Sequence, residues 1–181
     1  MVTTVKRTAA LILAALWLAA LPGCNMGLPD EVAACDYAHR NRRFAMNVPA
    51  GWHVQESRGV VSAFVVAPDG GAGRANVTVT VEPAGRFRDI EALARFNRQR
   101  TGRLPGLQRL ETGRRTLADG HEAALATFEH AATGEAVRQQ QLCVLADGLA
   151  YTVTATAAPP EAFEAYRDAF EIVFRSFRAA W

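Results

Sequence analysis

Residues 136–157 read AVRQQQLCVLADGLAYTVTATA and predict a pair of β-strands joined by a tight turn. The second half of the stretch alternates between an apolar set and a polar set, Tyr151, Val153 and Ala155 against Thr152, Thr154 and Thr156. This period of two is typical of a strand with one face buried and one face in water. Asp147-Gly148 separates the two halves. An Asp-Gly pair between extended runs favours a hairpin, because both turn positions need a positive φ.

Two more turns of this kind precede the stretch, at Asp119-Gly120 and Thr133-Gly134. Together they predict that Leu107–Ala157 forms an antiparallel meander. Closer to the N-terminus, extended and alternating patterns predict further strands over residues 37–48, 52–56, 60–66 and 75–82.

Two segments change to a helical period. From Phe87 to Arg100 the apolar positions and Asn97 recur on one face, with Arg88 and Arg95 on the opposite face. A second helix is expected from Glu161, with a continuous apolar stripe formed by Phe163, Tyr166, Phe170, Val173, Phe174 and Phe177. Burying such a stripe contributes about 10 kcal/mol before entropy is counted, so we expect this helix to pack on the sheet.

These patterns predict an α+β fold, in which an antiparallel sheet of about six to eight strands is packed by two amphipathic helices. No internal repeat or second domain is indicated. Residues 37–181 are therefore expected to form a single domain.

The N-terminus predicts a secretory signal peptide over residues 1–23. Lys6 and Arg7 stand before 13 apolar residues, 9–21, and a small residue, Gly23, precedes the expected cleavage site. As a helix the apolar run would be about 20 Å long, short of the roughly 30 Å hydrocarbon core of a bilayer. The run therefore indicates a signal peptide rather than a permanent membrane span.

Leu21-Pro22-Gly23-Cys24 resembles the lipobox of bacterial lipoproteins. In such proteins the cysteine thiol receives a diacylglyceryl group, and after cleavage the cysteine becomes the acylated N-terminus. We therefore expect Cys24 to carry acyl chains such as palmitate and residues 24–36 to act as a tether. Asn25 after the cysteine favours the periplasmic face of an outer membrane, if the cell has one. The alternative is an ordinary signal peptide with an incidental Cys24.

Cys35 and Cys143 are the other two cysteines. An even pair in a secreted protein favours a disulfide bond. The bond would close a loop of 109 residues, for which chain entropy predicts about 4–5 kcal/mol of stabilisation. Two separate buried thiols are the alternative.

The charges are unevenly distributed along the chain. Without the signal peptide, 18 arginines and 18 acidic residues remain and there is no lysine. Residues 86–115 contain nine arginines and three acidic residues, whereas residues 116–181 contain four arginines and nine acidic residues. Because clustered charge attracts the opposite sign, we expect Arg88, Arg95 and Arg98 to form part of a surface for an anionic lipid, glycan or protein. The alternative is a solvated face with no partner.

No catalytic residue, cofactor site, metal site or nucleic-acid partner is predicted. The chain has no HExxH, GxSxG, Walker or CxxC motif. His121 and His130 fall on one predicted strand at a spacing that points them to opposite faces, so they would not share a metal. The glycine-rich residues 70–73 join two strands and do not precede a helix, which disfavours phosphate binding.

The order of elements resembles the DcrB-like lipoproteins of the PsbP-like superfamily. The resemblance is carried by Phe44-x-x-x-Val48-Pro49-x-Gly51-Trp52, by the sequence YTVTATAAP at residues 151–159, and by Phe163 and Val173–Phe177. It covers most of residues 37–177 and implies an antiparallel sheet with helices packed against it. It implies no catalytic residues. Members of the superfamily serve as envelope lipoproteins, secretion chaperones or photosystem subunits, which implies a binding or scaffolding role.

Three classes of function follow from the sequence. A lipid-anchored, non-catalytic binding or assembly module of the cell envelope is favoured. A carrier of a small or lipidic ligand is the second class, and it would need a cavity between the C-terminal helix and the sheet. An enzyme with an unrecognised site is the third.

Overall fold

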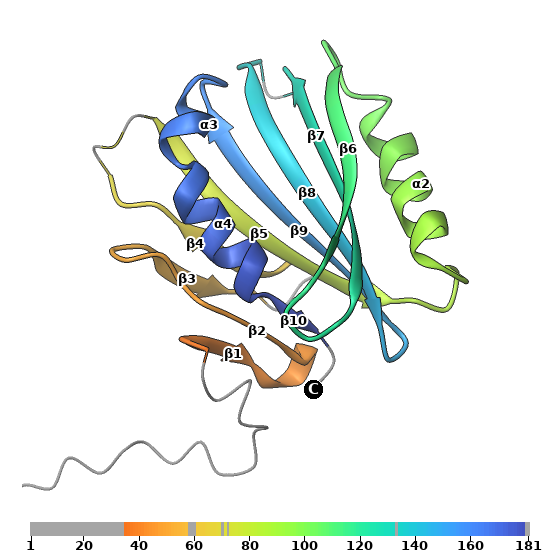
Figure 1. Cartoon of the computed structure of the whole chain (residues 1–181). Helices are drawn as coiled ribbons and strands as arrows, with labels where there is room; N and C mark the ends of the chain where they lie inside the picture. Colours follow the sequence, from red (N-terminus) through yellow and green to blue (C-terminus); the bar gives the residue numbers. More distant parts are fainter. Residues whose placement is uncertain (1–34, 58–60, 70, 72, 133, 180–181) are drawn as a thin grey trace, which may run out of the picture.

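The computed structural model describes residues 35–57, 61–69, 71, 73–132 and 134–179. The expected signal peptide, Cys24 and most of the expected tether lie outside these residues. The largest element is a seven-stranded antiparallel sheet (Figure 1). In order across the sheet its strands are β3 (His53–Glu56), β4 (Val61–Val66), β5 (Arg74–Pro83), β9 (Leu149–Ala158), β8 (Val137–Ala146), β7 (Glu122–His130) and β6 (Gln108–Thr116).

The predicted meander is confirmed, because β6, β7, β8 and β9 are neighbours in the order of the chain. At the hairpin between β8 and β9, Asp147 has a φ of 43° and Gly148 a φ of 77°. Both values are positive, as the Asp-Gly turn requires. The chain then joins its two halves by pairing β5 with β9 over ten residues, with Val79 opposite Val153.

A small second sheet has the order β1 (Tyr37–His39), β2 (Phe44–Met46) and β10 (Arg178–Ala179). The sequence predicted one strand over residues 37–48, but the structure forms a hairpin there, with the 3₁₀ turn η1 (Arg40–Arg42) between β1 and β2. Arg43 ends η1 with a φ of 52°, a left-handed conformation that an arginine gives no reason to predict. β10 was also unforeseen, because it forms only by pairing with β2.

The helices cover opposite faces of the large sheet. α2 (Ile90–Thr101) begins after Asp89, whose side chain caps the helix by accepting a hydrogen bond from the Ala92 N–H at 2.7 Å. α2 packs on β7 and β8 through its buried residues Leu93, Ala94 and Asn97. The expected C-terminal helix is broken at Tyr166 into α3 (Ala162–Ala165) and α4 (Arg167–Ser176), which lie on the other face (Figure 1).

The predicted apolar stripe is confirmed as the centre of the core. Phe163, Phe170, Val173, Phe174 and Phe177 are each at most 6% exposed, and Tyr166 is half-buried against the same cluster. The stripe packs on the apolar residues of β5, β8 and β9 and on the fully buried β2. Phe177 lies just past α4 and stacks on Phe44 of β2 with ring centres 5.8 Å apart. The C-terminal helices therefore join the small sheet to the large one.

The glycines that precede β5 make room for Tyr166. Its hydroxyl donates a hydrogen bond to the Gly73 carbonyl oxygen at 2.8 Å. A Cβ atom on Gly71 would lie 2.1 Å from the same hydroxyl, and one on Gly73 would lie 2.4 Å from the Ala158 carbonyl oxygen. A side chain at Gly71 or Gly73 would therefore collide with the Tyr166 hydroxyl or with the Ala158 backbone.

The predicted disulfide between Cys35 and Cys143 is not formed, which corrects the expectation from the cysteine count. Cys143 is buried on the α2 face, where its sulfur accepts a hydrogen bond from Asn97 Nδ2 at 3.0 Å. Cys35 lies near the end of α4, with its sulfur 4.0 Å from the Ser176 carbonyl oxygen. The large sheet separates the two thiols. Burial raises the pKa of the Cys143 thiol, against the opposing effect of hydrogen bonds with Asn97 and Thr152.

Truncation of a side chain in the stripe should lower the stability of the protein far more than truncation of a neighbouring surface residue. Phe174→Ala removes a fully buried ring and should lower the free energy of unfolding by about 3–5 kcal/mol. Ile172→Ala, on the exposed side of the same helix, is the matched control and should change it by less than about 1 kcal/mol. Urea unfolding followed by circular dichroism measures both, and equal losses would show that α4 does not hold the core.

Candidate functional site

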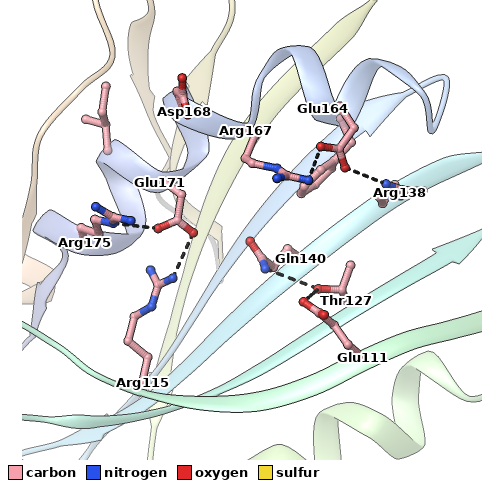
Figure 2. A pocket seen from close by; sticks show the side chains of 12 residues that line it. Glu111, Arg115, Thr127, Arg138, Gln140, Glu164, Arg167, Asp168, Glu171 and Arg175 are labelled. Atoms are coloured by element: carbon pink, nitrogen blue, oxygen red, sulfur yellow. Dashed lines mark hydrogen bonds and ion pairs between the residues drawn. The ribbon is translucent and has the colours of Figure 1, made fainter.

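An open groove of about 720 Å³ lies between the C-terminal helices and the strands β6, β7 and β8 (Figure 2). α3 and α4 supply one wall, and the sheet supplies the floor. The groove is lined by Glu111, Arg115, Thr127, Arg138, Gln140, Phe163, Glu164, Arg167, Asp168, Glu171, Ile172 and Arg175. Four arginines and four acidic residues are among these, so the groove is densely charged with both signs.

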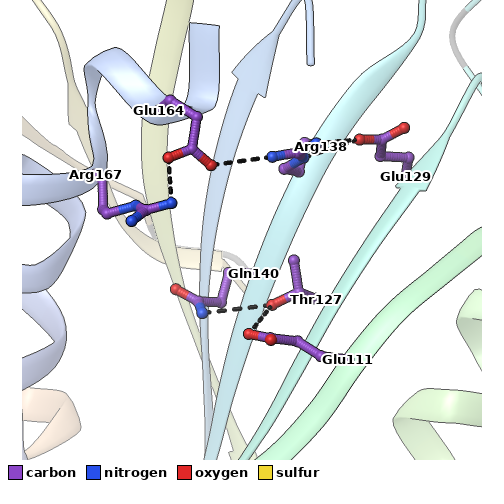
Figure 3. A network of polar contacts seen from close by, with 7 residues as sticks. All are labelled: Glu111, Thr127, Glu129, Arg138, Gln140, Glu164 and Arg167. Atoms are coloured by element: carbon purple, nitrogen blue, oxygen red, sulfur yellow. Dashed lines mark hydrogen bonds and ion pairs between the residues drawn. The ribbon is translucent and has the colours of Figure 1, made fainter. Parts of the chain in front are cut away.

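One end of the groove is bridged by Arg138 of β8 (Figure 3). Its Nη1 donates to Glu164 of α3 at 3.2 Å, and its Nε donates to Glu129 of β7 at 2.8 Å. Glu164 also pairs with Arg167 on the next turn. The Arg138 side chain is only 25% exposed, so both partners hold its guanidinium in one position against the helix.

The other end is bridged by Arg115 of β6. Its Nη2 donates to Glu171 of α4 at 3.0 Å, and Arg175 donates to the second oxygen of the same carboxylate at 3.0 Å. Burial acts to raise the pKa of Glu171, but its hydrogen bonds and charge interactions with Arg115 and Arg175 hold that pKa below the usual value. The other terminal nitrogen of Arg115, Nη1, is buried without a hydrogen-bond partner among the described residues.

The floor between the two bridges is polar and carries one carboxylate. Gln140 Nε2 donates to the Thr127 hydroxyl at 3.4 Å, and that hydroxyl donates to Glu111 at 3.5 Å (Figure 3). The three residues stand directly beside one another on β8, β7 and β6. Within the described ranges no arginine or histidine pairs with Glu111, which leaves its carboxylate available to a partner.

These groups can bind and orient charged atoms. No serine, cysteine or histidine is among the residues that line the groove, so it holds no Ser–His or Cys–His pair. The arginines are held by carboxylates, and a guanidinium can donate further hydrogen bonds to carbonyl or carboxylate oxygens. Among the described residues no group of three or more His, Cys, Asp or Glu side chains could hold a metal ion.

The arginines that the sequence singled out lie elsewhere, on α2 and just before it. Arg88 is 86% exposed and pairs with the adjacent Asp89. Arg95 is exposed, as its place opposite the apolar face predicts. Arg98 differs, because it is half-buried and lines a small pocket beside Cys143. The predicted surface for an anionic partner therefore has two outward arginines, Arg88 and Arg95, and Arg98 lies at the edge where the helix meets the sheet.

The groove was missed from the sequence, although β7 and β8 contain a signal for it. Leu142 and Val144 of β8 face the core, and Arg138 and Gln140 continue the same alternation on the same face. Polar residues at core-facing positions mark the point where the helix no longer covers a strand. Pairing across strands then brings Gln140 beside Thr127 and Arg138 beside Glu129.

Comparison with known proteins gives the family and the fold. A family model described as the serine/threonine kinase C-terminal domain matches residues 37–179. The chain belongs to this family. A comparison with curated protein sequences finds no match.

Three proteins with solved structures share the fold of this chain. CyanoP, the PsbP of Synechocystis sp. PCC 6803, is 13% identical, with a TM-score of 0.57 over 80% of this chain and 91% of its own. LpqN of Mycobacterium tuberculosis is 17% identical, with a TM-score of 0.57 over 76% and 83%. Mog1p of Saccharomyces cerevisiae is 10% identical, with a TM-score of 0.56 over 79% and 93%. The expected α+β, PsbP-like fold is confirmed by these likenesses.

Within the described ranges, no helix combines the length and the apolar character that crossing a bilayer requires.

The ion pairs at Glu171 should make stability depend on pH. Because the pKa of Glu171 is lowered by folding, its contribution is present above the pKa of the unfolded chain, near 4.3, and is lost as pH falls through the folded value. Glu171→Gln should therefore be less stable than the parent at pH 7, and the two should converge in acid.

Urea unfolding at a series of pH values measures this difference. Asp69→Asn is the control, because Asp69 is exposed and forms no ion pair with a described residue. If the stability deficit of Glu171→Gln stayed constant down to pH 3, well below the pKa of about 4.3 of a glutamate in an unfolded chain, a role for the charge would be contradicted.

Proposed function

We propose that this protein is a non-catalytic binding module held at a membrane, and that the groove between α3–α4 and β6–β8 receives its partner. The observation that carries the proposal is the double bridge across the groove. Arg138 and Arg115 each span from the sheet to the helices and are about a quarter exposed. Charged side chains held in this way lose little conformational entropy when a partner binds.

The chemistry of the groove favours a polar partner with charges of both signs, such as an extended segment of another protein. Glu111 offers a carboxylate without a cationic partner among the described residues, and Arg175, 77% exposed, offers a guanidinium with room for another acceptor. Ile172 lies on the rim and is 43% exposed, more than any other large apolar side chain that the structure describes. An apolar side chain surrounded by polar ones matches the layout of protein interfaces, which have an apolar centre and a polar rim.

The family description supports a role other than phosphoryl transfer. It names a domain that stands at the C-terminus of serine/threonine kinases. Protein kinases hold ATP phosphates with a lysine on their third strand, and residues 37–179 of this chain contain no lysine. The likeness is therefore to a domain outside the catalytic one, which fits a recognition function.

Anchoring by acyl chains on Cys24 is the second part of the proposal. The basic residues, apolar run and cysteine at the N-terminus support it, as does the likeness to LpqN, whose structure is described as that of a protein involved in cell envelope biogenesis. We propose that the domain faces away from the cytoplasm, at an outer membrane where there is one. Kinship with the DcrB-like lipoproteins belongs to the same proposal.

A lipid carrier is less well supported by the geometry. The space directly between α4 and the sheet is filled by buried aromatic side chains. The groove beside it is open and lined by charges, and acyl chains would leave those charges without water. A small polar ligand fits the same groove better than a lipid does.

The exposed arginines of the α2 region remain a proposed second contact. Arg88 and Arg95 could meet lipid phosphates or an anionic glycan, with Arg98 at the edge of that surface. Exposed ion pairs contribute about 0–1 kcal/mol each, so this contact would depend on several charges acting together.

Loss of the acylated cysteine should release the protein from the membrane. Each buried CH₂ of an acyl chain contributes about 0.8 kcal/mol, and Cys24→Ala removes all of them. In cell fractionation the variant should move from the membrane to the soluble fraction or remain as an uncleaved precursor. Cys35→Ala is the control and should fractionate like the parent. Unchanged fractionation and gel mobility of Cys24→Ala would contradict the anchor.

Photocrosslinking in intact cells should locate the binding surface. A benzoylphenylalanine at Ile172, on the rim of the groove, should yield discrete adducts with another envelope component. The same group at Gln99, on the exposed face of α2, is the matched control and should yield fewer. Arg138→Glu, which breaks one bridge of the groove, should reduce the adducts at Ile172. Adducts at Gln99 alone would move the binding surface to α2.

A further inference from the structure

The edge strand β6 is long and open. Its nine residues pair with β7 on one side, and no strand in the described part of the chain pairs with the other side (Figure 1). Gln108, Glu111, Thr112, Gly113, Arg114 and Thr116 are exposed. An open edge presents unpaired backbone N–H and C=O groups and is a template for another strand.

The backbone of β6 shows which of its residues face the open edge. At the end of the strand the Leu117 N–H donates to the His121 carbonyl oxygen at 2.8 Å. Along an antiparallel pair, the backbone N–H and C=O groups of successive residues point alternately toward the partner strand and away from it. The odd-numbered residues Gly113 and Arg115, like Leu117, therefore turn these groups toward β7. The even residues Thr112 and Arg114 therefore turn their N–H and C=O groups outward.

We propose that two copies of this chain pair through β6, antiparallel and centred on Gly113, and form one continuous sheet of both copies. In this register Gly113 faces the Gly113 of the second copy, Thr112 faces Arg114, and Glu111 faces Arg115. The outward backbone groups of Thr112 and Arg114 meet in two symmetric hydrogen-bonded pairs. Symmetry of this kind is that of the commonest protein dimers.

Among two-fold centres on residues 111–115, charge complementarity favours Gly113. A two-fold centre on Glu111, Arg114 or Arg115 would set that charge against its own copy, which is unfavourable. A centre on Thr112 would set Glu111 against Gly113 and leave the carboxylate without an opposite charge. Only a centre on Gly113 pairs Glu111 with Arg115 twice.

The shape of the strand agrees with this centre. Two residues on the axis form a pair without hydrogen bonds, in which the Cα atoms approach to about 4.5 Å. Gly113 has no side chain to obstruct this approach, and a Cβ placed there would meet no atom within 4 Å. Side-chain bulk is therefore lowest where the two strands would come closest.

Pairing would also join the two binding grooves. Glu111 and Arg115 line the groove and lie on β6, so each groove would continue across the axis into that of the second copy. One strand edge buries less than the roughly 1,200–2,000 Å² of a stable interface, so the dimer should be weak in solution. Confinement of both copies to one membrane, which rests on the proposed anchor, would raise their effective concentration.

Cysteine crosslinking of the full chain in membranes tests the register. With Cys35 replaced by Ser, Gly113→Cys should form a disulfide-linked dimer that a reductant reverses, because the Cα separation on the axis suits a disulfide. Thr116→Cys on the same strand is the control. Its two copies would be about 20 Å apart in this register and should not crosslink beyond the background.

A change of charge tests the same register independently. Thr112→Arg sets like charges opposite one another twice and should reduce Gly113→Cys crosslinking about tenfold, whereas Thr112→Glu should increase it. Light scattering of the full chain without the cysteine substitutions, in detergent and from about 10 to about 200 μM, should show dimers whose share rises with concentration. Thr112→Arg should remove these dimers.

Three results would overturn the proposal. They are equal crosslinking by Gly113→Cys and Thr116→Cys, equal behaviour of Thr112→Arg and Thr112→Glu, and a monomer at every concentration. If Gly113→Cys does not accumulate, the light-scattering comparison of the two Thr112 variants decides. Loss of Ile172 photoadducts with normal Gly113→Cys crosslinking would reject the groove and keep the dimer, so the two proposals fail separately.

Discussion

The fold depends on the burial of one aromatic stripe. The stripe of α3, α4 and Phe177 lies between the large sheet and the small one, and it touches both. Phe177 leaves the helix with an extended backbone, which turns the next two residues into β10 and pairs them with β2. Tyr151 of β9 contacts Phe177 and donates its hydroxyl to the backbone of Arg43. One set of apolar contacts therefore fixes the helix, the small sheet and the centre of the large sheet together.

The groove is a consequence of how far this stripe extends. α3 and α4 pack mainly over β9, β5 and β2, so the same face of β6, β7 and β8 is only partly covered. Where the helix covers β8, the residues are Leu142 and Val144; where it does not, they are Gln140 and Arg138. The boundary between core and groove thus runs across individual strands. On each strand, the residues on both sides of this boundary point to the same face of the sheet.

Arginine suits this boundary because its guanidinium can hold two acceptors while its stem packs on apolar residues. Arg138 joins Glu129 and Glu164, and its guanidinium lies 5.9 Å from the centre of the Phe163 ring. Arg86 plays a similar part next to α2, between Glu82 and the Phe96 ring. The absence of lysine after residue 6 means that every side-chain cation of the domain other than histidine can form such forks. The domain therefore has a small net charge but many charged side chains that are held in place by ion pairs.

Local patterns in the sequence determined the elements, because a period of two, a period of 3.6 and an Asp-Gly turn are properties of neighbouring residues. The meander, the amphipathic helical segments and the buried stripe follow from such local patterns and need no knowledge of long-range contacts. The patterns did not indicate the hairpin at Arg43 or the strand β10, which exist only where distant segments meet. The cysteine count likewise could not reveal that a sheet lies between Cys35 and Cys143. The groove belongs to the same class: Arg115, Arg138 and Glu171 are far apart in the sequence, and only the packing of α4 across the sheet brings their charges together.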